Sequence, residues 1–285
     1  MPAIVRIDVV LALSFLLALP AEAACDVALS PADIDRAIAI SIGAEYGDAR
    51  AAVARWHRDV TVGVAGDARP EDRATLAAVV AELGTLIAPT RIRLVEGGAD
   101  MLVQFAPVDE FSKLNPNYQP DNYGFFWMHW DGAGITDSDV LISTTGLTRA
   151  ETDHLIREEV TQALGMANDL GDEEDSIFYA PWTDTQAYSP SDTRVIRALY
   201  CADVRHGMAV DDFRDVLASQ AGPLDPAEIA ALQRALVARG HPLSDADGIV
   251  GDDTRQAIRA EQGALGLYAD GEPNRGLIAR LKVKL

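Results

Sequence analysis

The chain has 285 residues, 48% of them hydrophobic and 24% charged, so it is long enough for two ordinary domains with a sizeable core. Its formal net charge of −20 would repel a phosphate backbone and an anionic membrane surface. We therefore exclude nucleic acid as a partner.

Residues 1–24 have the features of a secretory signal peptide. Arg6 precedes an apolar run over 9–19, which is followed by Pro20 and a small-residue A-E-A-A segment. The apolar run is well short of the roughly 20 residues that span a bilayer. We expect a periplasmic or secreted protein with no membrane span.

The chain contains two cysteines, Cys25 and Cys201. In an oxidising compartment they predict one disulfide, closing a loop of about 175 residues and constraining the unfolded chain. Lipidation of Cys25 is the alternative, because this residue directly follows the cleavage region. Glu22 stands where bacterial lipoprotein signals have an aliphatic residue, which favours the disulfide.

Helices and strands alternate through the first part of the chain. Cap residues, apolar spacing and β-branched content predict helices over 30–46, 69–87, 148–165, 189–200 and 210–220, and strands over 59–66, 90–96, 100–107 and 138–144. A long irregular stretch is expected over 108–137. This order predicts an α+β domain over 25–220, with a mixed sheet packed on helices.

A second unit begins near Leu224, after the segment "SQAGPL". One helix is predicted over 224–240, and two turn–helix segments follow over 245–266 and 270–281. The unit, 224–285, is expected to be a small all-α three-helix domain.

The segments "IAALQRALVARG", "DGIVGDDTRQAI" and "LGLYADGEPNRGLIARL" resemble the bacterial peptidoglycan-binding domain. This resemblance implies peptidoglycan as a partner. The family usually has Phe where this chain has Glu261, and we expect that change to weaken the core or surface there.

The segment "HLIREEVTQALGMANDL", 154–170, resembles the active-site helix of the matrixin branch of the metzincin proteases. That clan carries H-E-x-x-H-x-x-G-x-x-H, in which three histidines hold zinc. At the corresponding positions this chain has Glu158, Glu159, Gln162, Gly165 and Asn168. The resemblance leaves Glu159 as the candidate catalytic residue and Gly165 as the turn glycine, and Phe178 stands where a Met-containing turn would be.

The pattern "REEVTQALGMAND…DSIFY" is also similar to a family of exported bacterial proteins with a domain of unknown function. In that family the Glu–Gln–Gly–Asn-Asp pattern is the rule. The resemblance therefore implies that Glu158, Gln162, Asn168 and Asp169 are family features, and we take them as candidate binding residues.

Amide oxygens are poor zinc ligands, so one carboxylate and two amides predict weak zinc binding and no metal site. His154 shares a helix face with Glu158, but this pair lacks an evident third ligand. The acidic loop over 168–176 has hard oxygen ligands without the spacing of a calcium loop. We expect no cofactor, with zinc and calcium kept open. Glu159, Gln162 and Asn168 then form either a structural polar network or a ligand site.

The aromatic stretch "NYGFFWMHW", 122–130, lies in the region expected to be irregular. Its rings either fill core or line a groove for sugar or peptide. Tyr123 and Trp127 are the candidate surface residues.

Taken together, these features predict an exported cell-envelope protein, a non-catalytic metzincin-like scaffold tethered to peptidoglycan by its C-terminal unit. The alternative is a divergent metallopeptidase or cell-wall hydrolase with non-standard ligands. Whether the chain is an enzyme stays open, with the missing histidines favouring a non-catalytic role.

Overall fold

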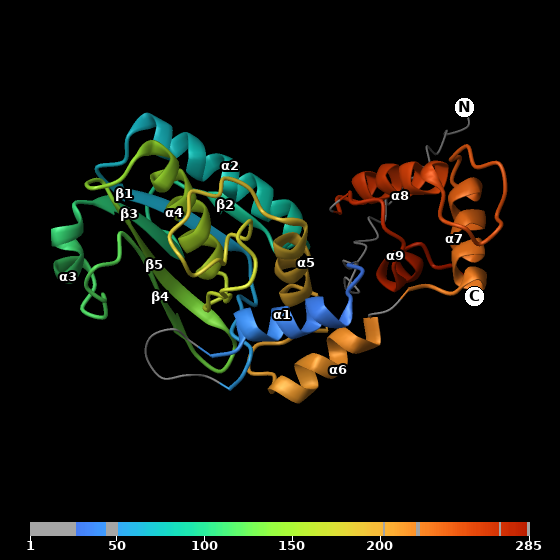
Figure 1. Cartoon of the computed structure of the whole chain (residues 1–285), viewed down its shortest axis with the longest axis horizontal. Coiled ribbons are helices and arrows are strands. Elements are labelled where there is room, and N and C mark those ends of the chain that lie inside the picture. Colours follow the sequence, from blue (N-terminus) through green and yellow to red (C-terminus); the bar gives the residue numbers. More distant parts are fainter. Residues whose placement is uncertain (1–26, 44–50, 202, 221–222, 268, 284–285) are drawn as a thin grey trace, which may run out of the picture.

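Figure 1 shows the computed structural model, which describes residues 27–43, 51–201, 203–220, 223–267 and 269–283. The predicted signal peptide and Cys25 lie outside these residues. Cys201 is buried, and its pairing with Cys25 stays a prediction. Within the described part of the chain, no helix is long and apolar enough to cross a membrane.

A five-stranded sheet has the order β2-β1-β3-β5-β4. The strands are β1 (Val60–Gly66), β2 (Ile92–Leu94), β3 (Met101–Ala106), β4 (Gly124–Trp130) and β5 (Ile135–Ser143). Neighbouring strands run parallel except β4, which pairs antiparallel with β5 at one edge. The predicted mixed sheet of an α+β fold is confirmed.

Strand β4 lies inside the stretch 108–137 that was expected to be irregular, so that expectation was wrong. Buried and exposed side chains do not alternate regularly along β4, because both faces of this strand are partly covered by the rest of the protein. Phe125 packs with Phe111 and Leu141 on one face, whereas Met128 joins the main core on the other. The usual inside–outside signature of a strand is therefore weak here.

The longer helices beside the sheet pack on it or on one another. They are α1 (Pro31–Ser41), α2 (Pro70–Leu86), α4 (Arg149–Gln162), α5 (Pro190–Leu199) and α6 (Val210–Gln220). A short 3-10 turn, η1 (Val108–Glu110), leads into α3 (Phe111–Leu114). Figure 1 shows α2 and α4 on the same side of the sheet, and α1 packs against α5 and α6. Capping boxes begin α1, α4 and α5, at Ser30, Thr148 and Ser189, as their sequences predict.

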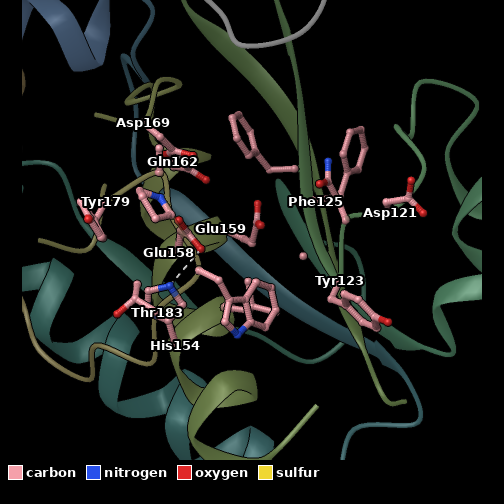
Figure 2. A pocket seen from close by; sticks show the side chains of 17 residues that line it. Asp121, Tyr123, Phe125, His154, Glu158, Glu159, Gln162, Asp169, Tyr179 and Thr183 are labelled. Atoms are coloured by element: carbon pink, nitrogen blue, oxygen red, sulfur yellow. Dashed lines mark hydrogen bonds and ion pairs between the residues drawn. The ribbon is translucent and has the colours of Figure 1, made fainter. Parts of the chain in front are cut away.

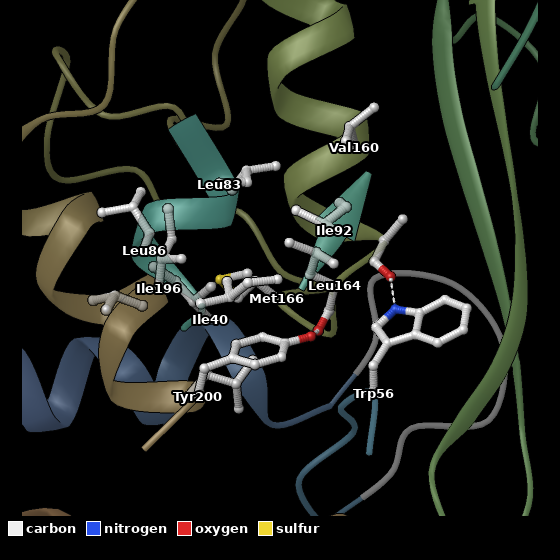
Figure 3. Close-up of a cluster of buried hydrophobic side chains, with 14 of the residues drawn as sticks. Ile40, Trp56, Leu83, Leu86, Ile92, Val160, Leu164, Met166, Ile196 and Tyr200 are labelled. Atoms are coloured by element: carbon white, nitrogen blue, oxygen red, sulfur yellow. Dashed lines mark hydrogen bonds between the residues drawn. The ribbon is translucent and has the colours of Figure 1, made fainter. Parts of the chain in front are cut away.

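The turn after α4 is fixed by two buried aromatic residues (Figure 3). The indole Nε1 of Trp56 donates to the carbonyl oxygen of Ala163 at 3.0 Å, and the Tyr200 hydroxyl donates to that of Leu164 at 2.9 Å. Gly165 follows with φ 109°, and a Cβ there would overlap the carbonyl oxygen of Ala54. Gly165 is thus a turn glycine, and α4 is held rigidly at its C-terminal end.

Residues 223–283 form a C-terminal helical region with its own apolar core around Leu232, Leu236 and Ile258. Its helices are α7 (Pro226–Ala238), α8 (Asp252–Ala264) and α9 (Arg275–Arg280). Side-chain amides of two glutamines hold the turns that follow α7 and α8. Gln233 bonds to Asp247 and Gly248, and Gln262 bonds in the same way to Asp270 and Gly271.

Glu261 is buried in this region, and its carboxylate contacts an arginine and a histidine. Its Oε1 lies 2.6 Å from Nε of Arg239, and its Oε2 lies 2.9 Å from Nε2 of His241. The desolvation of Glu261 alone would raise its pKa, but these partners hold the pKa of this carboxyl below its usual value. The polar residue in the place of the family's Phe is therefore accommodated by pairing.

An ion pair between buried Arg197 and partly exposed Asp270 joins the sheet region, 27–220, to the C-terminal helical region. Nη1 of Arg197 on α5 lies 2.5 Å from Oδ2 of Asp270, whose Oδ1 accepts from Gln262. The same aspartate therefore orders a turn of one region and contacts a helix of the other.

Candidate functional site

A pocket of about 200 Å³ opens between α4, β4 and the loop that follows the acidic segment (Figure 2). We call it the α4–β4 pocket. It is lined by Asp121, Asn122, Tyr123, Gly124, Phe125, Phe126, His154, Leu155, Glu158, Glu159, Gln162, Asp169, Tyr179, Ala180, Pro181, Trp182 and Thr183. Five of the seven predicted site residues are among them, namely Tyr123, Glu158, Glu159, Gln162 and Asp169.

His154 and Glu158 form an ion pair in this pocket, as their spacing on one helix face allows. Nε2 of His154 lies 3.2 Å from Oε2 of Glu158, and its Nδ1 lies 2.9 Å from the carbonyl oxygen of Thr185. A carbonyl oxygen accepts only, so Nδ1 carries a proton, and the carboxylate favours a second proton on Nε2. Burial alone would lower the pKa of His154, but Glu158, the Thr185 carbonyl and the charge of Asp184 hold it above its usual value.

Glu159 points from α4 toward β4, where Gly124 begins the strand. Glu159 is 7% exposed. A Cβ on Gly124 would overlap its Oε1 and lie 2.9 Å from Cδ2 of Leu155. The absence of a side chain at Gly124 is therefore what lets this carboxylate approach the strand.

The three positions that hold zinc in the metzincin pattern do not converge on one point. Glu158 pairs with His154, and the Gln162 amide donates to Oδ1 of Asp169 at 2.6 Å. Asn168 lies outside the pocket, because its amide donates to the carbonyl oxygens of Ala39 and Ile42 at the end of α1. This donor set does not fit a zinc ion, and the described residues contain no group of three His, Cys, Asp or Glu side chains that could hold a metal.

Tyr123 and Trp182 form an aromatic rim at the pocket. Their ring centroids lie 6.1 Å apart at an interplanar angle of 72°, and Trp182 is 59% exposed. The Trp182 Nε1 donates to Oε1 of Glu151 at 2.8 Å, which fixes the orientation of the exposed indole. Sequence reasoning did not single out Trp182, although a Trp beside Pro181 in a loop is a signal for it.

Trp127, the other aromatic candidate, does not line this pocket. Its ring stacks on Phe125, with centroids 6.4 Å apart and an interplanar angle of 15°, in the small cluster with Phe111. Alternation along β4 places the Trp127 side chain on the face opposite to that of Gly124, which lies next to Glu159 of α4.

The acidic loop after α4 is anchored to the N-terminal helix. Nη1 of Arg36 lies 2.8 Å from Oδ1 of Asp172, and Nη2 of Arg36 lies 2.9 Å from the Ser176 hydroxyl. Glu173 lies 3.4 Å from Nη2 of the same arginine, and Ser176 donates to buried Asp192 at 2.6 Å. Two carboxylates of this acidic loop, Asp172 and Glu173, thus have an arginine partner.

Residues 34–219 match the family described as "Protein of unknown function (DUF2927)", and residues 225–281 match the "Putative peptidoglycan binding domain" family. The chain belongs to the DUF2927 family. The family with a domain of unknown function that the sequence suggested is thereby confirmed, and a peptidoglycan-binding-type domain follows it in this DUF2927 protein. No curated protein is similar to it.

Two solved structures of myroilysin are similar to this DUF2927 chain at 13% identity and a TM-score of 0.36. Both cover 51% of this chain, and 95% and 85% of their own. SltB3 from Pseudomonas aeruginosa, solved in complex with NAG-anhNAM-pentapeptide, is 32% identical over 33% of this chain and 24% of its own, with a TM-score of 0.21. These overlaps define neither the fold nor the activity of the DUF2927 protein.

Proposed function

We propose that this protein is an exported, non-catalytic component of the cell envelope whose C-terminal helical region binds peptidoglycan. The observation that carries the proposal is the match of residues 225–281 to the peptidoglycan-binding family. The separate apolar core of this region supports its role as a binding module attached to the sheet region.

A shallow pocket beside the first glutamine-held turn is the proposed contact surface. It is lined by residues of this turn and of the start of α8, within 243–254, and by Gln233. Ile249, one of these lining residues, is 68% exposed. The Gln233 amide donates to the Ile249 carbonyl oxygen at 2.9 Å and so fixes the backbone that presents this side chain. An exposed aliphatic residue on a rigid turn favours contact with the apolar faces of a wall fragment.

The non-catalytic part of the proposal is supported by the arrangement of side chains on α4. Glu158, Gln162 and Asn168 have separate partners, and they assemble neither a zinc site nor a nucleophile with its base. The protein would therefore act by binding and positioning.

Sedimentation with purified peptidoglycan tests the binding role. The mature chain should pellet with peptidoglycan, and Ile249→Ser should reduce the pelleted fraction several-fold. Val237→Ser is the matched control, because Val237 is also an exposed aliphatic residue of this region but does not line the pocket. Equal pelleting of the mature chain and a chain truncated after Gly222 would contradict the proposal.

A further inference from the structure

The described lining of the α4–β4 pocket is rich in acidic side chains. Its lining contains four carboxyl side chains, Asp121, Glu158, Glu159 and Asp169, and no lysine or arginine among the described residues. The imidazole of His154 offsets one carboxylate, that of Glu158, and the Gln162 amide donates to Asp169 without changing its charge. The described lining of the pocket is therefore richer in carboxyl than in basic side chains, which disfavours an anionic ligand.

The aromatic rim provides a second and independent feature. The indole of Trp182 is exposed at the rim, yet its orientation is fixed by the hydrogen bond to Glu151 and by its edge contact with Tyr123. A large exposed ring held in one orientation is costly unless something packs on it. Aromatic faces attract ammonium groups and also pack against the methylene groups next to them.

The size of the pocket limits the ligand further. About 200 Å³ is below the roughly 300–1,000 Å³ of sites that enclose a whole small molecule. A single unbranched side chain fits this volume better than a sugar pair. Glu159 lies at the inner wall of the pocket, and its close approach to β4 depends on the absence of a side chain at Gly124. Its carboxylate is therefore held at the depth in the pocket that the end of an unbranched side chain would reach.

We propose that the α4–β4 pocket binds an alkylammonium group, with the charged end near Glu159 and Glu158 and the methylene groups against Trp182 and Tyr123. An alkylammonium group has three N–H donors, and two or more carboxylate oxygens can accept hydrogen bonds from them. This inference goes beyond the proposed wall-binding role, because it concerns a surface of the sheet region.

Titration calorimetry on the mature chain tests the proposal with Nα-acetyl-lysine amide as the probe. The Nε-acetylated analogue has the same chain without the charge, and it should bind at least about tenfold more weakly. Cadaverine, a free diamine, distinguishes the two sources of an alkylammonium group. If cadaverine binds as tightly as the lysine amide or more tightly, the site is assigned to free amines. If the lysine amide binds more tightly, the site is assigned to a peptide side chain. Equal affinity for the lysine amide and its acetylated analogue, or no binding of either amine, would overturn the proposal.

Variants locate the site on the protein. Glu159→Gln should weaken binding of the better amine about tenfold or more, and Trp182→Ala should weaken it by about three- to tenfold. Glu174→Gln is the control, because it removes the same charge from an exposed position outside the pocket, and it should leave the affinity unchanged. An equal effect of Glu159→Gln and Glu174→Gln would show that the protein's overall charge, and no pocket, attracts the amine.

Circular dichroism checks the fold of each variant, and the comparison of the two amides needs no variant at all. Peptidoglycan pelleting is measured separately, so either proposal can fail without the other.

Discussion

The Nε2 atom of His154 lies 3.2 Å from Oε2 of Glu158, one turn along α4, while its Nδ1 is committed to the Thr185 carbonyl. Both ring nitrogens therefore need a proton. The imidazolium form is the one that the folded protein stabilises, and the pair links the charge of the pocket to pH.

Because the folded protein holds the pKa of His154 above the ordinary 6.5, this pair should stabilise the fold most at low pH. Its contribution is fully present below pH 6.5 and is lost as pH rises through the raised, folded-state pKa. Urea unfolding should show that Glu158→Gln lowers the free energy of unfolding by about 1–2 kcal/mol at pH 6 and by less at pH 8.5.

Asp137→Asn is the control for this experiment. It removes the carboxylate from the His129–Asp137 pair, whose two side chains are both more than half exposed. Its effect should be small at both pH values. A Glu158→Gln effect that is the same at pH 6 and pH 8.5 would show that His154 does not carry the second proton.

Gly124→Ala should lower the free energy of unfolding by about 1–3 kcal/mol, because the added methyl group overlaps Glu159 and crowds Leu155. In a double-mutant cycle, Glu159→Ala should relieve part of this cost, with a coupling energy of about 0.5–3 kcal/mol. Chemical denaturation of the four proteins measures it. Purely additive effects would mean that the methyl group is accommodated without contact with Glu159.

Asp270→Asn should loosen the attachment of the C-terminal helical region to the sheet region. Arg197 is buried, so the loss of its ion pair with Asp270 should lower the free energy of unfolding by about 1–3 kcal/mol and speed proteolysis of the connecting segment before Leu224. Asp35→Asn is a matched control, because the Arg214–Asp35 pair has the same 2.5 Å distance but is exposed. Its effect should stay within about 1 kcal/mol. Equal proteolysis of both variants and the unaltered chain would contradict a role for Arg197–Asp270 in holding the two regions together.

Purified protein incubated with equimolar zinc and then dialysed should retain much less than one zinc per chain. Glu158, Gln162 and Asn168 have separate partners, and two of them are amides, which bind zinc poorly. Elemental analysis by mass spectrometry measures the content. Stoichiometric zinc that is lost in Glu158→Gln would favour the alternative of a divergent metallopeptidase.

Local signals in the sequence predicted the frame of the site. The Thr148 capping box and Gly165 mark both ends of α4, and the spacing of His154 and Glu158 places them on one face. These features depend on residues a few positions apart, so periodicity and cap chemistry are sufficient to find them.

The remainder of the pocket depends on contacts that no local pattern encodes. Asp121 precedes β4 and Trp182 follows the acidic loop, and only the folded sheet brings these segments beside α4. Asn168 matched a ligand position in the sequence, but its amide bonds to backbone carbonyls of α1, 126 and 129 residues away. Tertiary hydrogen bonding decided the direction of this side chain.

Arg36 holds the acidic loop from 136 residues away, and that separation has a consequence for the order of folding. The loop continues directly into the wall of the pocket that contains Tyr179 and Trp182. Until the chain has been made at least as far as Asp172, Arg36 has no partner in this loop, and closing so long a span is slow compared with forming a helix. During synthesis the pocket should therefore form only after the acidic loop and the wall residues that follow it have been made, and a nascent chain that ends before Trp182 should be unable to bind the ligand.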